Sequence, residues 1–459
     1  MSLLLTIHSA HTGLKTSAAG INVVGHNTAN ATSEGYTRRE IVATSGHPLQ
    51  RDGHWLGQGT RTRHFMRQSD FFVERQLVKT HAKQSQAESA YESIRLLESR
   101  LNDGMSNSIV ETYNRFIDSM KQLAQDPGDT VFRSQLIDDA EDFTGAVRDS
   151  GAFSIERQSS IREEAEFSLQ EVNANFRSIA EHNKRIRQSN VTMTNSDLMD
   201  QRDRLIANLS KQIGVDVHYR ADGQATVFFN GHPVVQESHA RSFSYDEDSD
   251  DRPVINLSSD SGFIDVTDGL QGELGGKMEA YDTAQDFLDD LSTFVIDFTV
   301  DFNTQHASGY DMSGTAGGDF FSMNSTSPVT SFGVDSTLAD DVTLIAAAGA
   351  ATAEYGDRDN LDQLIAIDSV AMFNSGAFTS RQFLTHIYAN LAQNTADAEN
   401  DYELYSHQMD DMFELRTSIS GVDLDQEAMK LMEYQASYEA AARVLTISNQ
   451  LLGELMNVV

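Results

Sequence analysis

The chain of 459 residues contains no cysteine, only five prolines and a single tryptophan. The absence of cysteine excludes disulfides, thiolate zinc sites, iron–sulfur clusters and cysteine nucleophiles together. No apolar run approaches the ~18 residues that a membrane-spanning helix requires. What remains is a soluble globular protein, and its length predicts two to four domains.

Positive charge is also scarce. The chain has 34 basic and 69 acidic residues, a formal net charge of −35. Because phosphate backbones and anionic membranes bind basic surfaces, this balance argues against nucleic acid or a membrane as a partner. The N-terminal stretch MSLLLTIHSAHTGLK lacks a preceding cation and a long apolar core, so it is not a Sec-type signal peptide. Pattern alone therefore places the protein in the cytosol.

Motifs of common enzymes are missing as well. The sequence has no P-loop, no HExxH, no GxSxG and no dinucleotide-binding fingerprint. His8 and His11 lie three apart on a helix but have no further ligand nearby, which favours surface histidines over a metal site. The segment DMSGTAGGDFFS resembles a calcium loop but carries Ser322 where the twelfth ligand should be acidic. We expect no enzyme activity, no cofactor and no metal.

One charge cluster has two interpretations. The stretch LMDQRDRLIANL could supply paired carboxylates for acid–base chemistry, or it could form ion pairs on a helix surface. The apolar Leu198, Leu205 and Leu209 describe a helix that packs on a core, which favours surface ion pairs. The charged residues concerned are Asp200, Arg202, Asp203 and Arg204.

Both ends of the chain carry apolar residues at alternating spacings of three and four, the pattern of a coiled-coil seam. The N-terminal seam includes Leu3, Ile7, Leu14, Ile21 and Val24. The C-terminal seam includes Leu424, Leu431, Tyr438, Leu445 and Leu452. These ten residues are the predicted assembly contacts, and the alternative is that the stripes pack within their own subunit.

The fold class predicted from the whole pattern is mainly α with a small inserted antiparallel β domain. The terminal heptad helices are predicted to form a coiled-coil-like axial core. Period-two alternation with Asp222-Gly223 and Asn230-Gly231 turns marks the β domain. The predicted segments are an axial helix (1–30), an extended or looped segment (31–70), a helical domain (71–213), the β domain (214–270), a returning helix (271–305), a Gly/Ser/Thr-rich segment with short β structure (306–359), a helical region (360–418, with helices near 360–375 and 378–418) and a C-terminal axial helix (419–459).

The N-terminal stretch GLKTSAAGINVVGHNTANATSEGYTRRE resembles the shared signature of bacterial flagellar axial proteins. Four further stretches, in the same order, resemble the hook-associated family within that group: GHWLGQGTRTRHFMRQSDFFVERQL, LMDQRDRLIANLSKQIGVDV, DFNTQHASGYDMSGTAGGDFF and SISGVDLDQEAMKLMEYQASYEAAARVL. His26 and Thr28 depart from the signature. The region between Phe321 and Leu361 is short, so we expect an outer domain of the longer members to be reduced or missing.

This resemblance implies a structural subunit at the first layer of the hook–filament junction, needed for filament assembly. It implies a ring of about eleven copies in contact with hook protein and the second junction protein. It also implies type III export in place of the Sec pathway, an export chaperone on the C-terminal helix, and an extracellular location that replaces the cytosolic one. The alternatives are another axial protein (second junction protein, hook or rod subunit) and, more remotely, an unrelated coiled-coil enzyme.

Overall fold

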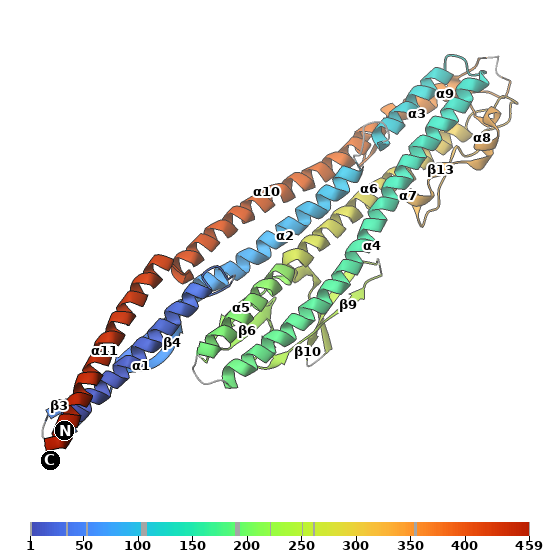
Figure 1. The fold of residues 1–459 in the computed structure, drawn as a ribbon. Helices are drawn as coiled ribbons and strands as arrows, with labels where there is room; N and C mark the ends of the chain where they lie inside the picture. Colours follow the sequence, from blue (N-terminus) through green and yellow to red (C-terminus); the bar gives the residue numbers. More distant parts are fainter. Residues whose placement is uncertain are drawn as a thin grey trace. The chain divides into compact units, whose positions relative to one another are not determined.

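The computed structural model describes residues 2–33, 35–51, 54–101, 108–188, 193–220, 222–249, 251–259, 262–352 and 356–458, and it is mainly helical (Figure 1). Its helices are α1 (Ser2–Ala29), α2 (Phe71–Leu101), α3 (Ile109–Leu123), α4 (Thr130–Gln188), α5 (Met193–Ile213), α6 (Gly272–Ala307), α7 (Pro328–Ser331), α8 (Ser336–Asp340), α9 (Asp359–Ala366), α10 (Ser380–Ser420) and α11 (Leu424–Val458). None of the described helices is long and apolar enough to cross a membrane.

The strands form small antiparallel sheets. Two sheets make up the β domain, with strand orders β5-β6-β7-β8 and β11-β10-β9, and the other sheets are two-stranded. The strands are β1 (Arg39–Ser45), β2 (Leu49–Arg51), β3 (His54–Leu56), β4 (Thr60–Arg67), β5 (Asp216–Tyr219), β6 (Ala225–Phe229), β7 (His232–Gln236), β8 (His239–Ala240), β9 (Phe243–Glu247), β10 (Pro253–Ser259), β11 (Gly262–Asp265), β12 (Phe321–Ser322), β13 (Gly333–Val334), β14 (Ala371–Phe373) and β15 (Phe378–Thr379).

The chain divides into two compact units. The terminal unit comprises residues 1–85, 168–272 and 404–459, and the middle unit comprises 86–167 and 273–403. Both ends of the chain and the β domain therefore belong to one unit. The predicted fold class, mainly α with an inserted antiparallel β domain and long terminal helices, is confirmed.

Within the terminal unit, α4 carries the β domain. Phe243 of β9 packs against Phe176 of α4 and Phe229 of β6, with ring centroids 5.4 and 5.2 Å apart. Asn183 of α4 exchanges two hydrogen bonds with the backbone of Ala225, which satisfies a strand edge that would otherwise lack partners. The hairpin turn between β6 and β7 is the predicted Asn230-Gly231, and φ is positive at both residues.

The core of the middle unit is aromatic. Phe298 of α6 is fully buried and contacts Tyr113 of α3, Phe143 of α4 and Phe321 of β12, with ring centroids 5.6 to 6.0 Å apart. The predicted break after α3 is present, because Gly128 N–H donates to the Asp126 carboxylate and Asp129 caps the start of α4 through Val131 N–H.

The helix predicted near 360–375 is wrong beyond Ala366, where α9 ends. A short 3-10 turn and the β14–β15 hairpin follow, with Phe373 fully buried against Phe294 and Phe383. The turn places Asn374 and Ser375 at positive φ, which a right-handed helix cannot accommodate. Burial of Phe373 in the aromatic core thus overrides the local helical pattern.

Candidate assembly interface

The two terminal helices pair within the chain. α1 and α11 lie side by side and antiparallel, with both termini at one end of the pair (Figure 1). A Cβ atom at Gly20 would lie 2.6 Å from the ring of Tyr434, and one at Gly13 would lie 3.7 Å from the Cβ of Ala441. Small residues on α1 therefore allow close approach of α11.

Asn27 is the hub at the other end of this pair. Its amide donates to the carbonyl of Arg39 at 2.9 Å and to the Glu427 carboxylate at 3.0 Å. Its carbonyl oxygen accepts from Arg39 N–H at 3.0 Å and from the Tyr36 hydroxyl at 2.7 Å. Both amide hydrogens and both lone pairs of the carbonyl oxygen of this buried side chain thus make hydrogen bonds. These bonds join α1, the segment that follows it and α11.

Glu427 completes the connection. It is 1% exposed and pairs with Arg38 at 3.0 Å. Nearby, Lys430 of α11 pairs with Glu40 of β1, and Arg38 N–H donates to the carbonyl of Ser420. The Asn-rich turn and the YTRRE stretch of the sequence are therefore the residues that attach the N-terminal helix to the start of α11.

The β1–β4 ribbon lies against α1. Thr60 donates to Thr16 at 3.2 Å, and Gly59 has a positive φ of 80°. A Cβ at Gly59 would lie 2.3 Å from the hydroxyl of Thr12, so this strand start requires glycine for space as well as for conformation. The segment predicted as extended or looped thus contains strands that run along the terminal helix.

Part of the charge cluster of α5 is buried, whereas Asp203 is half-buried and Arg204 is exposed. Asp200 is 6% and Arg202 1% exposed, which contradicts the predicted helix-surface pairs. Two arginines of the ribbon enter the cluster: Arg39 contacts Asp197 and Asp200 at 2.6 and 2.8 Å, and Arg67 contacts Asp200 and Asp203 at 2.8 Å. The cluster fastens the ribbon to α5. Periodicity in α5 did not reveal this because the burying surface comes from strands more than a hundred residues away.

Burial and arginine neighbours compete at these carboxylates. Burial raises the pKa of Asp203, but Arg202 and Arg67 outweigh it and hold that pKa below its ordinary value. Burial also raises the pKa of Asp200, and there Arg67 and Arg39 do not fully offset it. Asp200 is therefore the carboxylate that depends most on keeping both arginines.

Another buried group gives the terminal unit a pH dependence. Burial, with Lys211 and Arg416 nearby, lowers the pKa of His81 from 6.5 to about 4. As pH falls, His81 is protonated in the unfolded chain before it is protonated in the folded one. The folded state therefore keeps its whole free energy of unfolding above pH 6.5 and loses up to about 3 kcal/mol of it as pH falls toward 4. We expect the urea midpoint of the terminal unit to fall over this range, and the fall to be smaller in His81→Gln.

The matched control is His218→Gln, which alters an exposed histidine of the same unit. The loss of the edge contact between His81 and Phe413 lowers stability equally at each pH, so the difference in slope is the readout. Equal slopes in His81→Gln and the parent would contradict the assignment to His81.

The structure places the ten predicted assembly residues in different environments. Val24 is buried, and seven others are half-buried beside the α1–α11 contact: Leu3, Ile7, Leu14, Ile21, Leu431, Leu445 and Leu452. Leu424 and Tyr438 are exposed, at 55% and 42%. The intrachain contact uses Glu427, Tyr434, Ala441 and Ser448, each seven residues from the next, on a neighbouring face of the helix.

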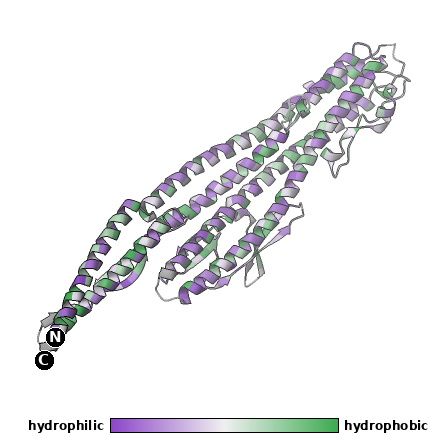
Figure 2. Ribbon diagram, in the orientation of Figure 1, coloured by the Kyte–Doolittle hydropathy of each residue, from purple (hydrophilic) through white to green (hydrophobic). Residues whose placement is uncertain are grey.

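A second apolar face of α11 is left uncovered by the described part of the chain. Hydrophobic residues alternate with polar ones along both terminal helices (Figure 2). Several large ones on α11 are exposed, among them Met432 at 61% and Ile447 at 56%. This outer stripe lies about 120° around the helix from the α1 contact. It comprises Met429, Met432, Ala436, Ala440, Val444, Ile447, Leu451 and Leu455. Exposed apolar surface of this extent marks an interaction site.

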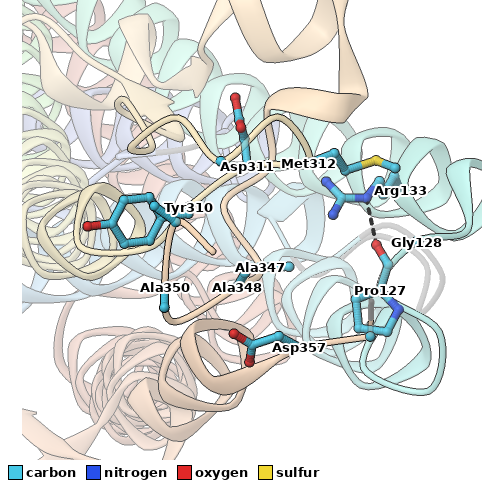
Figure 3. A pocket seen from close by; sticks show the side chains of 13 residues that line it. Pro127, Gly128, Arg133, Tyr310, Asp311, Met312, Ala347, Ala348, Ala350 and Asp357 are labelled. Atoms are coloured by element: carbon cyan, nitrogen blue, oxygen red, sulfur yellow. Dashed lines mark hydrogen bonds between the residues drawn. The ribbon is translucent and has the colours of Figure 1, made fainter. Parts of the chain in front are cut away.

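The middle unit has a small cavity lined by polar groups. It encloses about 150 Å³ beside Arg133, Asp311 and Asp357 (Figure 3). Arg133 donates to the carbonyls of Pro127 and Ile345, both at 2.8 Å. The Asp311 carboxylate accepts from Ser313 N–H within its own turn, and Asp357 accepts from Gly349 N–H. These polar groups hold the surrounding loops in place.

No metal site is found among the described residues. No group of three or more histidine, aspartate or glutamate side chains in those parts of the chain could hold an ion. His8 and His11 are exposed on α1. Asp311, the first residue of the calcium-like stretch, serves as a local turn cap.

Comparisons with known proteins agree with this architecture. The profile described as the flagellar hook-associated protein FlgK helical domain matches residues 94–321, and that of the flagellar basal body rod FlgEFG protein C-terminal region matches 416–458. Together they match more than half of the chain. Flagellar hook-associated protein 1 of Salmonella typhimurium is 24% identical over 98% of this chain and 99% of its own length.

The protein of the same name from Bacillus subtilis is 24% identical over 99% of this chain and 98% of its own. In structure, the chain is similar to the flagellar hook junction protein FlgK from Burkholderia pseudomallei, with a TM-score of 0.67 and 12% identity over 75% of this chain and all of the other. With similarity that extends from one terminal helix to the other, the chain belongs to the flagellar hook-associated protein 1 family.

Proposed function

We propose that this protein is a structural subunit of the bacterial flagellum that forms the hook–filament junction, connects hook to filament and is needed for filament assembly. The observation that carries the proposal is similarity to flagellar hook-associated protein 1 over 98% of the chain, the assembly helices included. The pairing of α1 and α11 leaves the outer stripe exposed. An axial assembly requires such an exposed apolar surface on each subunit for contact with other copies.

Self-association through the terminal unit is part of this proposal. None of the described residues covers the outer stripe, and α1 occupies a different face of α11, so we infer that another copy buries the stripe. We infer a ring of about eleven copies, in contact with hook protein on one side and the second junction protein on the other. The exposed residues among the ten predicted ones, Leu424 and Tyr438, are contacts in this ring.

Before assembly the outer stripe needs protection. We infer a flagellar export chaperone that covers α11, because exposed apolar surface of this kind promotes aggregation. The absence of cysteine suits passage of an unfolded chain through a type III export channel, since no disulfide can trap it. The protein would then be secreted and act outside the cell, at the junction.

The chain is also shorter than its Salmonella relative. An alignment over 555 residues leaves at least 96 positions opposite gaps in a chain of 459. We infer that much of this difference lies between Phe321 and Leu361, where the chain forms only short elements, α7, α8 and the β12–β13 pair among them. A reduced outer domain leaves the terminal unit, and hence assembly, unaffected.

Loss of filaments is the expected result when the outer stripe is charged. In a strain that lacks the gene, we expect hooks without filaments and filament protein in the medium, both reversed by the parent gene. The Ile447→Asp gene should restore at least about tenfold fewer filaments than the parent gene, because a carboxylate would be buried in the contact between copies. Ile447 is exposed in the subunit, so the fold should persist. Filaments are counted by electron microscopy.

Phe263→Asp is the matched control, since it introduces the same charge at a residue of the β domain that is 72% exposed. Export of each variant is measured by its amount in the medium. Normal filaments in the strain without the gene would reject the junction role. Normal filaments with Ile447→Asp alone would remove the outer stripe from the interface.

A further inference from the structure

Basic residues are concentrated where the chain begins. Residues 1–70 contain seven basic and four acidic residues, in a chain whose net charge is −35. α1 has no acidic residue at all. The middle unit, in contrast, holds 39 acidic and 11 basic residues, so middle units of adjacent copies repel at close range. A contact between copies is therefore favoured in the terminal unit.

Three cations of this segment are available to a partner. Arg38, Arg39 and Arg67 already pair with carboxylates of their own chain. Lys15 of α1 and Arg61 and Arg63 of β4 are exposed, and none makes an ion pair with a described residue. Exposed apolar side chains lie on the same two elements, Leu4 at 60% and Met66 at 41%. This is a basic surface with apolar contacts.

The outer stripe of α11 has the complementary charge. Glu433 and Glu439 lie among its apolar residues; both are exposed and neither pairs with a described cation. Two copies that joined α11 to α11 would place these carboxylates against each other. Contact between α11 and the α1–β4 surface instead places them against Lys15, Arg61 and Arg63.

We propose that α11 of one copy docks on the α1–β4 surface of the next copy, with Glu433 and Glu439 facing Arg61, Arg63 and Lys15. The two surfaces differ, so the contact is heterologous and repeats from copy to copy, which is the geometry that closes a ring. The inference rests on the proposed function, since it names the partner surface of the same assembly. In this contact Arg61 and Arg63 of the ribbon bind α11 of the neighbouring copy.

Charge reversal tests the pairing. In the strain that lacks the gene, Arg61→Glu/Arg63→Glu and Glu433→Arg/Glu439→Arg should each reduce filament number about tenfold or more, because each sets like charges in contact. All four substitutions combined in one chain should restore filaments, since the basic α11 of each copy then meets the acidic ribbon of the next copy at every contact of the ring. Filament number and export of each variant are measured.

Arg177→Glu/Arg185→Glu is the matched control. It makes the same change in net charge at exposed arginines of α4 in the same unit, and should leave filament number unchanged. Circular dichroism of the purified chains checks that each variant folds. Arg63→Cys/Ala436→Cys, in this otherwise cysteine-free chain, should give cross-links between neighbouring copies and none within a copy.

The outcomes separate the two proposals. If the parent gene restores filaments but Arg61→Glu/Arg63→Glu also does so, the α1–β4 partner is rejected and the junction role stands. If the chain with all four substitutions forms no more filaments than Glu433→Arg/Glu439→Arg alone, the two surfaces do not face each other and the α1–β4 partner is rejected. If the strain without the gene has normal filaments, the junction role itself fails.

Discussion

Replacement of Arg39 by methionine is expected to lower the free energy of unfolding of the terminal unit by about 3–5 kcal/mol. The Arg39 side chain is 0% exposed and contacts both Asp197 and Asp200. Without it, Asp200 remains buried with only Arg67 as counter-ion, and breaking a buried pair costs more than the pair contributes. Hydrogen exchange during urea titration, read in β4 and α5, measures the loss.

Arg61→Met is the control, because it removes an exposed guanidinium from the same ribbon without breaking an ion pair to a described residue. The double variant Arg39→Met/Asp200→Asn should recover part of the stability, since the unpaired charge is gone. If Arg39→Met lowers the free energy of unfolding by less than about 1 kcal/mol, water solvates the Asp200 carboxylate in place of Arg39. The ion pairs then do not hold the ribbon against α5.

Phe298→Ala is expected to destabilise the middle unit by a similar amount, about 3–5 kcal/mol. Phe298 is fully buried and packs against aromatic rings from α3, α4, α6 and β12. These rings come from separate helices and a strand and cannot all move into the space, so a cavity remains. Urea titration with hydrogen exchange in α3 and α6 gives the change.

Phe167→Ala removes the same atoms from a phenylalanine of α4 that is 64% exposed, and should change stability by less than about 1 kcal/mol. The terminal unit supplies a second internal control, since its exchange should be unaffected by Phe298→Ala. Equal effects of the two variants would show that the aromatic cluster relaxes around the deletion and does not hold the helices rigidly.

Prediction from sequence worked where structure is local. The Asn230-Gly231 turn, the break at Asp126 to Gly128 and the long helices follow from residue conformational preferences and from periodicity over a few turns. The same approach failed at 367–375, because Phe373 gains more from burial in a distant aromatic core than from continuing the helix.

The heptad pattern predicted α11 to be an interface helix but could not specify its faces. Apolar residues are spread over more than one side of α11, so several stripes satisfy spacings of three and four. The face toward α1 is chosen by small residues such as Gly20 and Gly13, which admit Tyr434 and Ala441. That choice leaves Met432 and Ile447 outside.

Composition and periodicity were enough to predict the helical architecture, the inserted β domain, the lack of cysteine chemistry and the likeness to flagellar axial proteins, because each depends on residue content or on neighbours along the chain. Three features became visible only in the folded chain: Asp200 of α5 is buried beneath Arg39 and Arg67, Asn27 joins α1 to Glu427, and one particular stripe of α11 remains uncovered. Those features depend on contacts between residues more than a hundred positions apart, and local periodicity carries no information about such partners.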